Sequence, residues 1–156
     1  MPQPDFNVRQ LSSSDTQELR RLNQLFADVF DDAESFVRHP PKDEYLQKLL
    51  GNHSIFVLAS FAGEEIIGGL VAYELMKFEQ ERSEIYIYDL AVAEAHRRKG
   101  VATTLIEHLR DIASQRGAWV IYVQADYGDD PAVALYEKLG IREDVMHFDI
   151  AAKPLR

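Results

Sequence analysis

The feature that most constrains the fold is a strand, a basic turn, a helix and a second strand that follow one another without a linker. Residues 83–92 (SEIYIYDLAV) and 119–125 (WVIYVQA) have the composition of strands. Between them, apolar residues recur at helical spacing from Gly100 to Gly117. A helical crossover of this length predicts that the two strands lie parallel in one sheet. The almost continuous apolar run further predicts that residues 119–125 are buried on both faces.

The other segments predict more strands and helices around this crossover. The expected strands cover residues 6–11, 54–62, 65–78 and 145–150, and the expected helices begin near Asp15, at Pro41 and at Pro131. Asp15 and Glu18 have the spacing of a capping box, and Gly51 is expected to end the second helix. The order β-α-α-β-β-β-α-β-α-β predicts an α/β protein with one mixed sheet.

The last expected helix covers residues 131–139. Asp129 or Asp130 should cap its start, and Gly140 should close it. The strands at residues 54–62 and 65–78 should meet in a turn at Gly63 and Glu64.

Length and charge narrow the classes of function. The 156 residues fit one domain, 1–156, that is large enough to bury a core. A net charge of −9, from 17 basic and 26 acidic side chains, disfavours a nucleic-acid partner and favours a cationic small molecule. Residues 1–10 lack a signal-peptide pattern, and no apolar run reaches the roughly 20 residues of a membrane span. We therefore expect a cytoplasmic protein with no membrane partner.

The composition predicts neither a disulfide nor a metal site. The chain has no cysteine, which excludes disulfides and thiolate ligands. No pair of its 5 histidines has the spacing of metal ligands, so we predict no metal.

The turn HRRKG, residues 96–100, is basic in an otherwise acidic chain. The first turn of a helix has unpaired backbone N–H groups and the positive end of the helix dipole. Gly100 allows a tight entry, and Arg97, Arg98 and Lys99 add positive charge. The pattern predicts an anion site suited to phosphate, and the alternative is a solvated turn before an amphipathic helix.

Two motifs resemble those of the GNAT family of N-acetyltransferases. Arg97-x-x-Gly100-x-Ala102 is similar to the family's [Q/R]-x-x-G-x-[G/A] turn, and residues 129–141 are similar to its N-x-x-A-x-x-L-Y-x-x-x-G-F motif. The second motif departs from the family pattern at Asp129 in place of Asn and at Ile141 in place of Phe. Residues 77–92 and 119–150 further resemble the type I aminoglycoside 3-N-acetyltransferases, the gentamicin-resistance branch.

The resemblance implies the GNAT fold, a mostly antiparallel sheet with a splayed pair of parallel strands and flanking helices. It implies acetyl coenzyme A as the co-substrate, with its pantetheine arm along the first splayed strand and its pyrophosphate at the basic turn. The residues expected to bind it are Leu90, Ala91, Val92, Arg97, Arg98, Lys99, Gly100, Val101, Ala102 and Thr103. It also implies transfer to the 3-amino group of an aminoglycoside, and a homodimer.

An amine acceptor needs a base, because only its neutral form attacks. Asp89 interrupts an apolar strand, and alternation places it on the face of Ile85, Ile87 and Ala91 unless a bulge intervenes. Such surroundings should raise its pKa, as suits a base. The alternatives are a buried acid satisfied by a backbone amide, or Asp126 as the base. The resemblance makes Tyr136 the acid that protonates the departing thiolate.

Acidic residues follow the second splayed strand. Asp126, Asp129 and Asp130 stand within five residues, and helix capping needs only one of them. We expect the others to bind a polycationic sugar, with Glu84 and Tyr88 as further candidates for the acceptor pocket. The competing interpretations are the same chemistry on another small polyamine or on a protein N-terminus, and a non-catalytic module that binds coenzyme A.

Overall fold

The computed structural model describes residues 5–154. The expected domain, 1–156, and the expected absence of a signal sequence in residues 1–10 both include residues 1–4, which lie outside the described residues, as do 155–156. Contacts divide the chain into two compact units, Met1–Gln124 and Ala125–Arg156.

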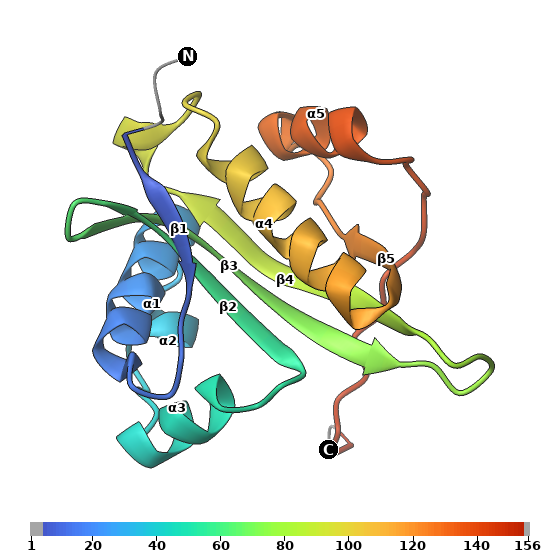
Figure 1. Cartoon of the computed structure of the whole chain (residues 1–156), viewed down its shortest axis with the longest axis horizontal. Coiled ribbons are helices and arrows are strands. Elements are labelled where there is room, and N and C mark those ends of the chain that lie inside the picture. The colour runs from blue at the N-terminus through green and yellow to red at the C-terminus, as the bar shows by residue number, and fades with distance from the viewer. Residues whose placement is uncertain (1–4, 155–156) are drawn as a thin grey trace. The chain divides into compact units, whose positions relative to one another are not determined.

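A five-stranded mixed sheet forms the framework of the first unit (Figure 1). Its strands are β1 (Asn7–Gln10), β2 (Ile55–Ala62), β3 (Glu65–Met76), β4 (Ser83–Val92) and β5 (Ala118–Val123), in that spatial order. Neighbours from β1 to β4 pair antiparallel, and β4 pairs parallel with β5. The parallel pair follows from the crossover through helix α4 (Val101–Arg116), so this part of the sequence-based prediction is confirmed.

Helices cover both faces of the sheet. A Cβ atom added to Gly68 of β3 would meet Val101 of α4, whereas one added to Gly69 would meet Leu22 of helix α1 (Thr16–Phe30). Because adjacent residues of a strand point to opposite faces, α4 and α1 lie on opposite sides of the sheet. Helices α2 (Ala33–Phe36) and α3 (Asp43–Leu50) follow α1, and buried side chains of α1 and α3 form one core cluster with those of β2.

One extra residue interrupts the ladder between β3 and β4. Val71 pairs with Asp89 and Ala72 pairs with Ile87, so Tyr88 has no counterpart on β3. This two-against-one arrangement is a β-bulge, which bends a strand and reverses the faces of the residues beyond it. The bulge matters for the site, because it falls one residue before Asp89.

Helix α5 (Asp130–Leu139) is the regular element of the second unit. The Asp129 side chain accepts a hydrogen bond from the Ala132 N–H at 3.4 Å, and Pro131 lies in the first turn. The helix ends before Gly140, whose N–H bonds to the Tyr136 carbonyl oxygen at 2.9 Å. The prediction of a helix capped by an aspartate here and closed by Gly140 is confirmed.

Three expectations about local structure were wrong. Residues 145–150 form no strand, and their apolar side chains are exposed. Residues 119–125 are not buried on both faces, because none of them is fully buried and Trp119 is 54% exposed. Pro41 lies before the helix that starts at Asp43 rather than in its first turn.

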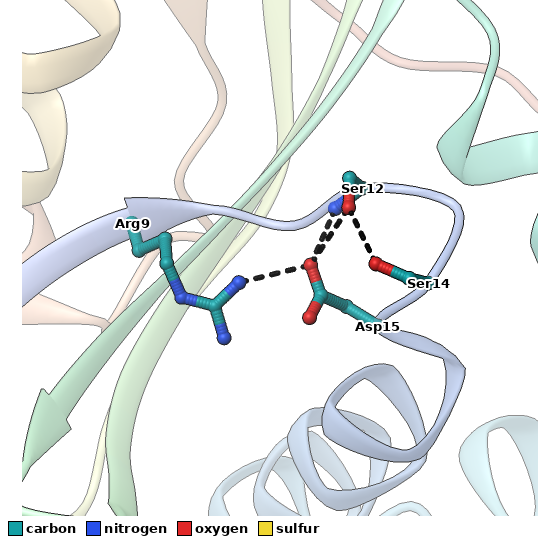
Figure 2. Close-up of polar contacts among 4 residues, drawn as sticks. All are labelled: Arg9, Ser12, Ser14 and Asp15. Atoms are coloured by element: carbon teal, nitrogen blue, oxygen red, sulfur yellow. Dashed lines mark hydrogen bonds and ion pairs between the residues drawn. The ribbon is translucent and has the colours of Figure 1, made fainter.

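The capping box at the start of α1 is also absent (Figure 2). The Asp15 side chain points away from the helix, and its Oδ2 atom accepts hydrogen bonds from the Ser12 N–H at 2.7 Å and from Nη1 of Arg9 on β1 at 2.9 Å. Burial would raise the pKa of Asp15, but these hydrogen bonds outweigh it and hold the pKa below its usual value. Arg9 therefore competes with the helix terminus for this carboxylate.

Candidate active site

The basic turn joins β4 to α4 through a single turn of 3-10 helix, η1 (Glu94–His96). Gly100 is the N-cap of α4 with φ of +81°, and no side chain caps the helix. No acidic residue occupies the first turn. The N–H groups at residues 101–103 therefore point out of the helix without an intrahelical acceptor, at the positive end of its dipole. This geometry is that of an anion site.

The three basic side chains of the turn differ in their surroundings. All of Arg97, Arg98 and Lys99 are exposed. Arg97 donates from Nε to the Val92 carbonyl oxygen at 3.3 Å, which ties the turn to the end of β4. Arg98 has a positive φ of 63°, a conformation that is costly for a residue with a side chain. The turn thus holds its backbone in a fixed shape and leaves cationic groups facing solvent.

The two parallel strands separate before β4 ends. The β4–β5 pairing covers Ser83 to Ile87 on β4 and ends at Val123 on β5, whereas β4 continues to Val92. The end of β4 therefore has a free edge on its β5 side within the first unit. This agrees with the splayed pair expected from the resemblance.

Backbone directions alternate along this free part of β4. The Ala93 N–H bonds to the Ile67 carbonyl oxygen of β3 at 2.8 Å, and the Ala91 carbonyl oxygen lies 3.1 Å from a Cβ built on Gly68. Both groups point toward β3. Alternation therefore directs the N–H groups of Leu90 and Val92 to the free edge and that of Ala91 away from it. Two of the three expected backbone contacts have the geometry that an added extended chain requires.

The bulge decides the position of Asp89. Because Ile87 pairs with Ala72 and Asp89 pairs with Val71, the two side chains lie on opposite faces of the sheet. The expectation that Asp89 shares the face of Ile85 and Ile87 was therefore wrong, because the bulge intervenes between Ile87 and Asp89. Asp89 lies instead on the α1 face, with Ala91. It is half-buried, and this burial raises the pKa of its carboxyl.

Four tyrosines near this carboxylate form a chain of ring contacts, and we call them the tyrosine face: Tyr73, Tyr86, Tyr88 and Tyr122. Ring centroids lie 5.9 Å apart for Tyr73 and Tyr88, 5.6 Å for Tyr86 and Tyr88, and 4.7 Å for Tyr86 and Tyr122. All three pairs meet edge to face, as aromatic quadrupoles prefer.

Two carboxylates, those of Asp89 and Glu84, lie beside the tyrosine face, and Glu84 also forms an ion pair with Lys77 Nζ at 3.9 Å. Burial and, next, the Asp89 carboxylate raise the pKa of Tyr73. Burial and, next, the Glu84 carboxylate raise the pKa of Tyr122. Both phenols are therefore neutral at pH 7. A half-buried face with neutral rings and carboxylates favours a cation.

The second unit contains the other predicted site residues. Asp126, Asp129 and Asp130 are all exposed, and of the three it is Asp129 that caps α5. Tyr136 is half-buried on α5. Burial first, and the Asp129 charge second, raise its pKa to about 12, so its hydroxyl keeps its proton throughout the physiological pH range.

Sequence reasoning missed two members of this set. Tyr73 and Tyr122 were not among the expected site residues. Each is the single tyrosine of its predicted strand, so no sequence pattern marks it, and only the strand register places both beside Tyr86 and Tyr88. Within residues 5–154, no three His, Cys, Asp or Glu side chains gather as a metal site requires, and no helix is long and apolar enough to cross a bilayer.

Comparisons with known proteins agree with this arrangement. The chain is 51% identical to an aminoglycoside acetyltransferase from an uncultured soil metagenomic sample, with a TM-score of 0.93 over 95% of this chain and 99% of that one. It is 31% identical to a second such enzyme from an uncultured soil metagenomic sample, solved with sisomicin and with trehalose, with a TM-score of 0.88 over 95% and 97% of the two chains.

Another similar protein has a different activity. The N-alpha-acetyltransferase of Saccharolobus solfataricus is 25% identical over 146 residues, which cover 89% of this chain and 81% of the relative. The model of the acetyltransferase (GNAT) family matches residues 19–141, across both units and across both motifs. With the mixed sheet, its splayed strands and the basic turn, this match shows that the chain belongs to the GNAT family of acetyltransferases.

Proposed function

We propose that this protein transfers the acetyl group of acetyl coenzyme A to an aminoglycoside, at the 3-amino group of its deoxystreptamine ring. The observation that carries the proposal is the 51% identity to an aminoglycoside acetyltransferase over 95% of the chain. We further propose that the two units form one domain, because the family match runs through both. A cytoplasmic homodimer remains part of the proposal.

The basic turn fits the pyrophosphate of acetyl coenzyme A. The hydrogen-bond donors are the N–H groups at residues 101–103 and the exposed side chains of Arg98 and Lys99. The helix dipole adds positive charge at the same place. When bound, acetyl coenzyme A would supply the thioester whose acetyl group is transferred. The free edge of β4, with the N–H groups of Leu90 and Val92, supports the expected place of the pantetheine arm.

Gly100→Ala is expected to weaken acetyl coenzyme A binding about tenfold, because an alanine Cβ disfavours φ of +81° by roughly 1–2 kcal/mol and the first turn must shift to relieve it. Gly117→Ala is the matched control. Gly117 has φ of +74° at the other end of α4, and neither glycine has an atom within 4 Å of an added Cβ. Thermal unfolding of the two variants should show similar losses of stability. Calorimetric titration with acetyl coenzyme A should show a loss of affinity in Gly100→Ala alone. Equal affinities of the two variants would contradict this assignment.

Asp89 is proposed to remove the proton from the attacking amine, directly or through one water. Its burial supports this role, since a raised pKa brings the carboxylate closer to the basicity that proton abstraction needs at neutral pH. A backbone N–H at the free edge of β4 is proposed to stabilise the negative charge that develops on the acetyl oxygen. Asp126 is the alternative base, and it is exposed.

Tyr136 is proposed to protonate the departing thiolate. Its hydroxyl retains a proton at neutral pH, which a general acid requires. Transfer is proposed to be direct within a ternary complex, because no nucleophilic side chain is evident and the chain has no cysteine.

Carboxylates are proposed to hold the ammonium groups of the acceptor. Asp126 and Asp130 are exposed, and Glu84 is half-buried beside Tyr122. The net charge of −9 favours the approach of such a polycation. Binding through exposed carboxylates should weaken as salt rises.

Coenzyme A release, measured with gentamicin, kanamycin and spermidine as separate acceptors, tests the proposal. Turnover with gentamicin, and an acetyl group located on its 3-amino nitrogen by NMR, is the expected result. Turnover with spermidine alone would contradict the proposed aminoglycoside acceptor and would still support N-acetyl transfer. Binding of acetyl coenzyme A with no turnover on any amine would favour a non-catalytic module.

N-terminal acetylation of proteins is the second candidate function. It is favoured by the 25% identity to the N-alpha-acetyltransferase over 89% of the chain. A peptide with a free N-terminal alanine, added to the same assay, distinguishes the two: rapid acetylation of the peptide alone would replace the aminoglycoside proposal.

A further inference from the structure

We propose that the tyrosine face is the platform on which the acceptor binds, with an ammonium group of the amino sugar held over the exposed ring of Tyr88 and beside Asp89. The inference rests on the proposed function, and it adds residues and a physical mode of recognition to it. It is carried by ring geometry, exposure, the bulge and the distribution of cations in the described part of the chain.

Ring contacts and one hydrogen bond hold the tyrosine face together. Tyr86 contacts the rings of both Tyr88 and Tyr122, and its hydroxyl donates to Gln124 Oε1 at 2.9 Å. Tyr73, Tyr86 and Tyr122 are half-buried, whereas Tyr88 is 66% exposed. Three fixed rings therefore support a fourth that is open to solvent. Such preorganisation lowers the entropy lost on binding.

The bulge creates this juxtaposition. In a regular strand, Tyr88 and Asp89 would point to opposite faces, and one of them would face α4. With Tyr88 as the extra residue, Asp89 pairs with Val71 on the α1 face, where Tyr88 also meets Tyr73. A sheet gains no pairing from a bulge, since the extra residue is left out of the ladder. Its effect here is to place an exposed ring next to a half-buried carboxylate.

The arginine–ring contacts of the described residues fall outside the tyrosine face, and the Lys77 ammonium group near it pairs with Glu84 at 3.9 Å. In the described residues, arginine guanidinium groups lie over Phe61, Trp119 and Phe56, at 5.0, 4.2 and 5.3 Å from the ring centroids. None of the rings so occupied belongs to the tyrosine face. Its π surfaces are therefore available to a cation from outside, and an ammonium group attached to a sugar ring matches both the aromatic face and the carboxylate.

A recognition residue of this kind predicts a particular kinetic pattern. Tyr88 holds the acceptor equally in the ground state and in the transition state, so its loss should raise KM and leave kcat nearly unchanged. Asp89 is both the proposed base and a neighbour of the bound ammonium group, so its loss should lower kcat as well as raise KM. This difference separates binding by the ring from catalysis by the carboxylate.

The test compares Tyr88→Leu with Tyr88→Phe in gentamicin titrations by calorimetry and in steady-state turnover. Tyr88→Leu should raise both Kd and KM about tenfold, and Tyr88→Phe should restore most of this loss because it keeps the aromatic face. Phe78→Leu is the control, since Phe78 is 97% exposed and belongs to no part of the site. Neutral trehalose should bind wild type and Tyr88→Leu with similar affinity.

The outcomes distinguish this proposal from the proposed function. Gentamicin turnover with equal KM values for wild type and Tyr88→Leu would overturn the platform and leave the function standing. Gentamicin binding that depends on Tyr88 without turnover would overturn the function and leave the platform. Neither binding nor turnover in wild type would overturn both.

Discussion

Asp89→Asn is expected to lower kcat for aminoglycoside acetylation at pH 7 by about 10²-fold or more, the range that a positioned general base contributes. The amide keeps the size of the side chain and cannot accept a proton. Steady-state kinetics of wild type and Asp89→Asn should show this loss with little change in KM for acetyl coenzyme A. Asp126→Asn is the comparison, because Asp126 is the alternative base: a larger loss in Asp126→Asn would exchange the two roles.

The pH dependence carries a second signature of Asp89. Its pKa is raised by burial, so kcat/KM for wild type should fall as pH decreases through a value above 3.8, the usual pKa of the group. A group with a raised folded-state pKa contributes stability at low pH that is lost as pH rises through that value. At pH 7, Asp89→Asn should therefore be at least as stable to urea as wild type, and the difference should shrink toward pH 3.8. Low activity in a stable variant excludes misfolding as its cause.

Tyr136→Phe is expected to lower kcat by about 10²-fold, since phenylalanine retains the packing on α5 and removes the only proton that the side chain can donate. Because its pKa is about 12, Tyr136 should stay protonated throughout the assay range of roughly pH 6 to pH 9. The wild-type rate should therefore show no pH dependence that arises from Tyr136. Single-turnover kinetics with acetyl coenzyme A and gentamicin measures the step itself.

Tyr127→Phe is the matched control for this variant. Tyr127 belongs to the same unit and is 84% exposed, so its hydroxyl is expected to be dispensable. Equal rates for Tyr136→Phe and wild type would remove Tyr136 from the chemistry and leave protonation of the thiolate to solvent.

The fold was predictable to the extent that local patterns determine it. Periodicity identified α4, and the glycines at 100 and 117 marked both its ends. The alternation of Met146, Phe148 and Ile150 resembles that of a strand, yet a strand needs a partner and no pairing occurs there. Likewise, the apolar run at 119–125 predicted a strand buried on both faces, but burial depends on neighbours in space, which the sequence does not contain, and none of these residues is fully buried.

The site shows the same limit more sharply. The basic turn was predictable because its glycine, its charges and its helix are contiguous in sequence. The face of Asp89 was not, since one unpaired residue reverses it and nothing local marks Tyr88 as that residue. The grouping of Tyr73 with Tyr122 depends on the registers of two strand pairs, β3 with β4 and β4 with β5.

The most direct measurement of the central claim is a competition for one supply of acetyl coenzyme A. Equimolar gentamicin and a peptide with a free N-terminal alanine are incubated with the protein, and both products are quantified by mass spectrometry. We predict acetylated gentamicin with the peptide unmodified. Acetylated peptide with unmodified gentamicin would contradict the account.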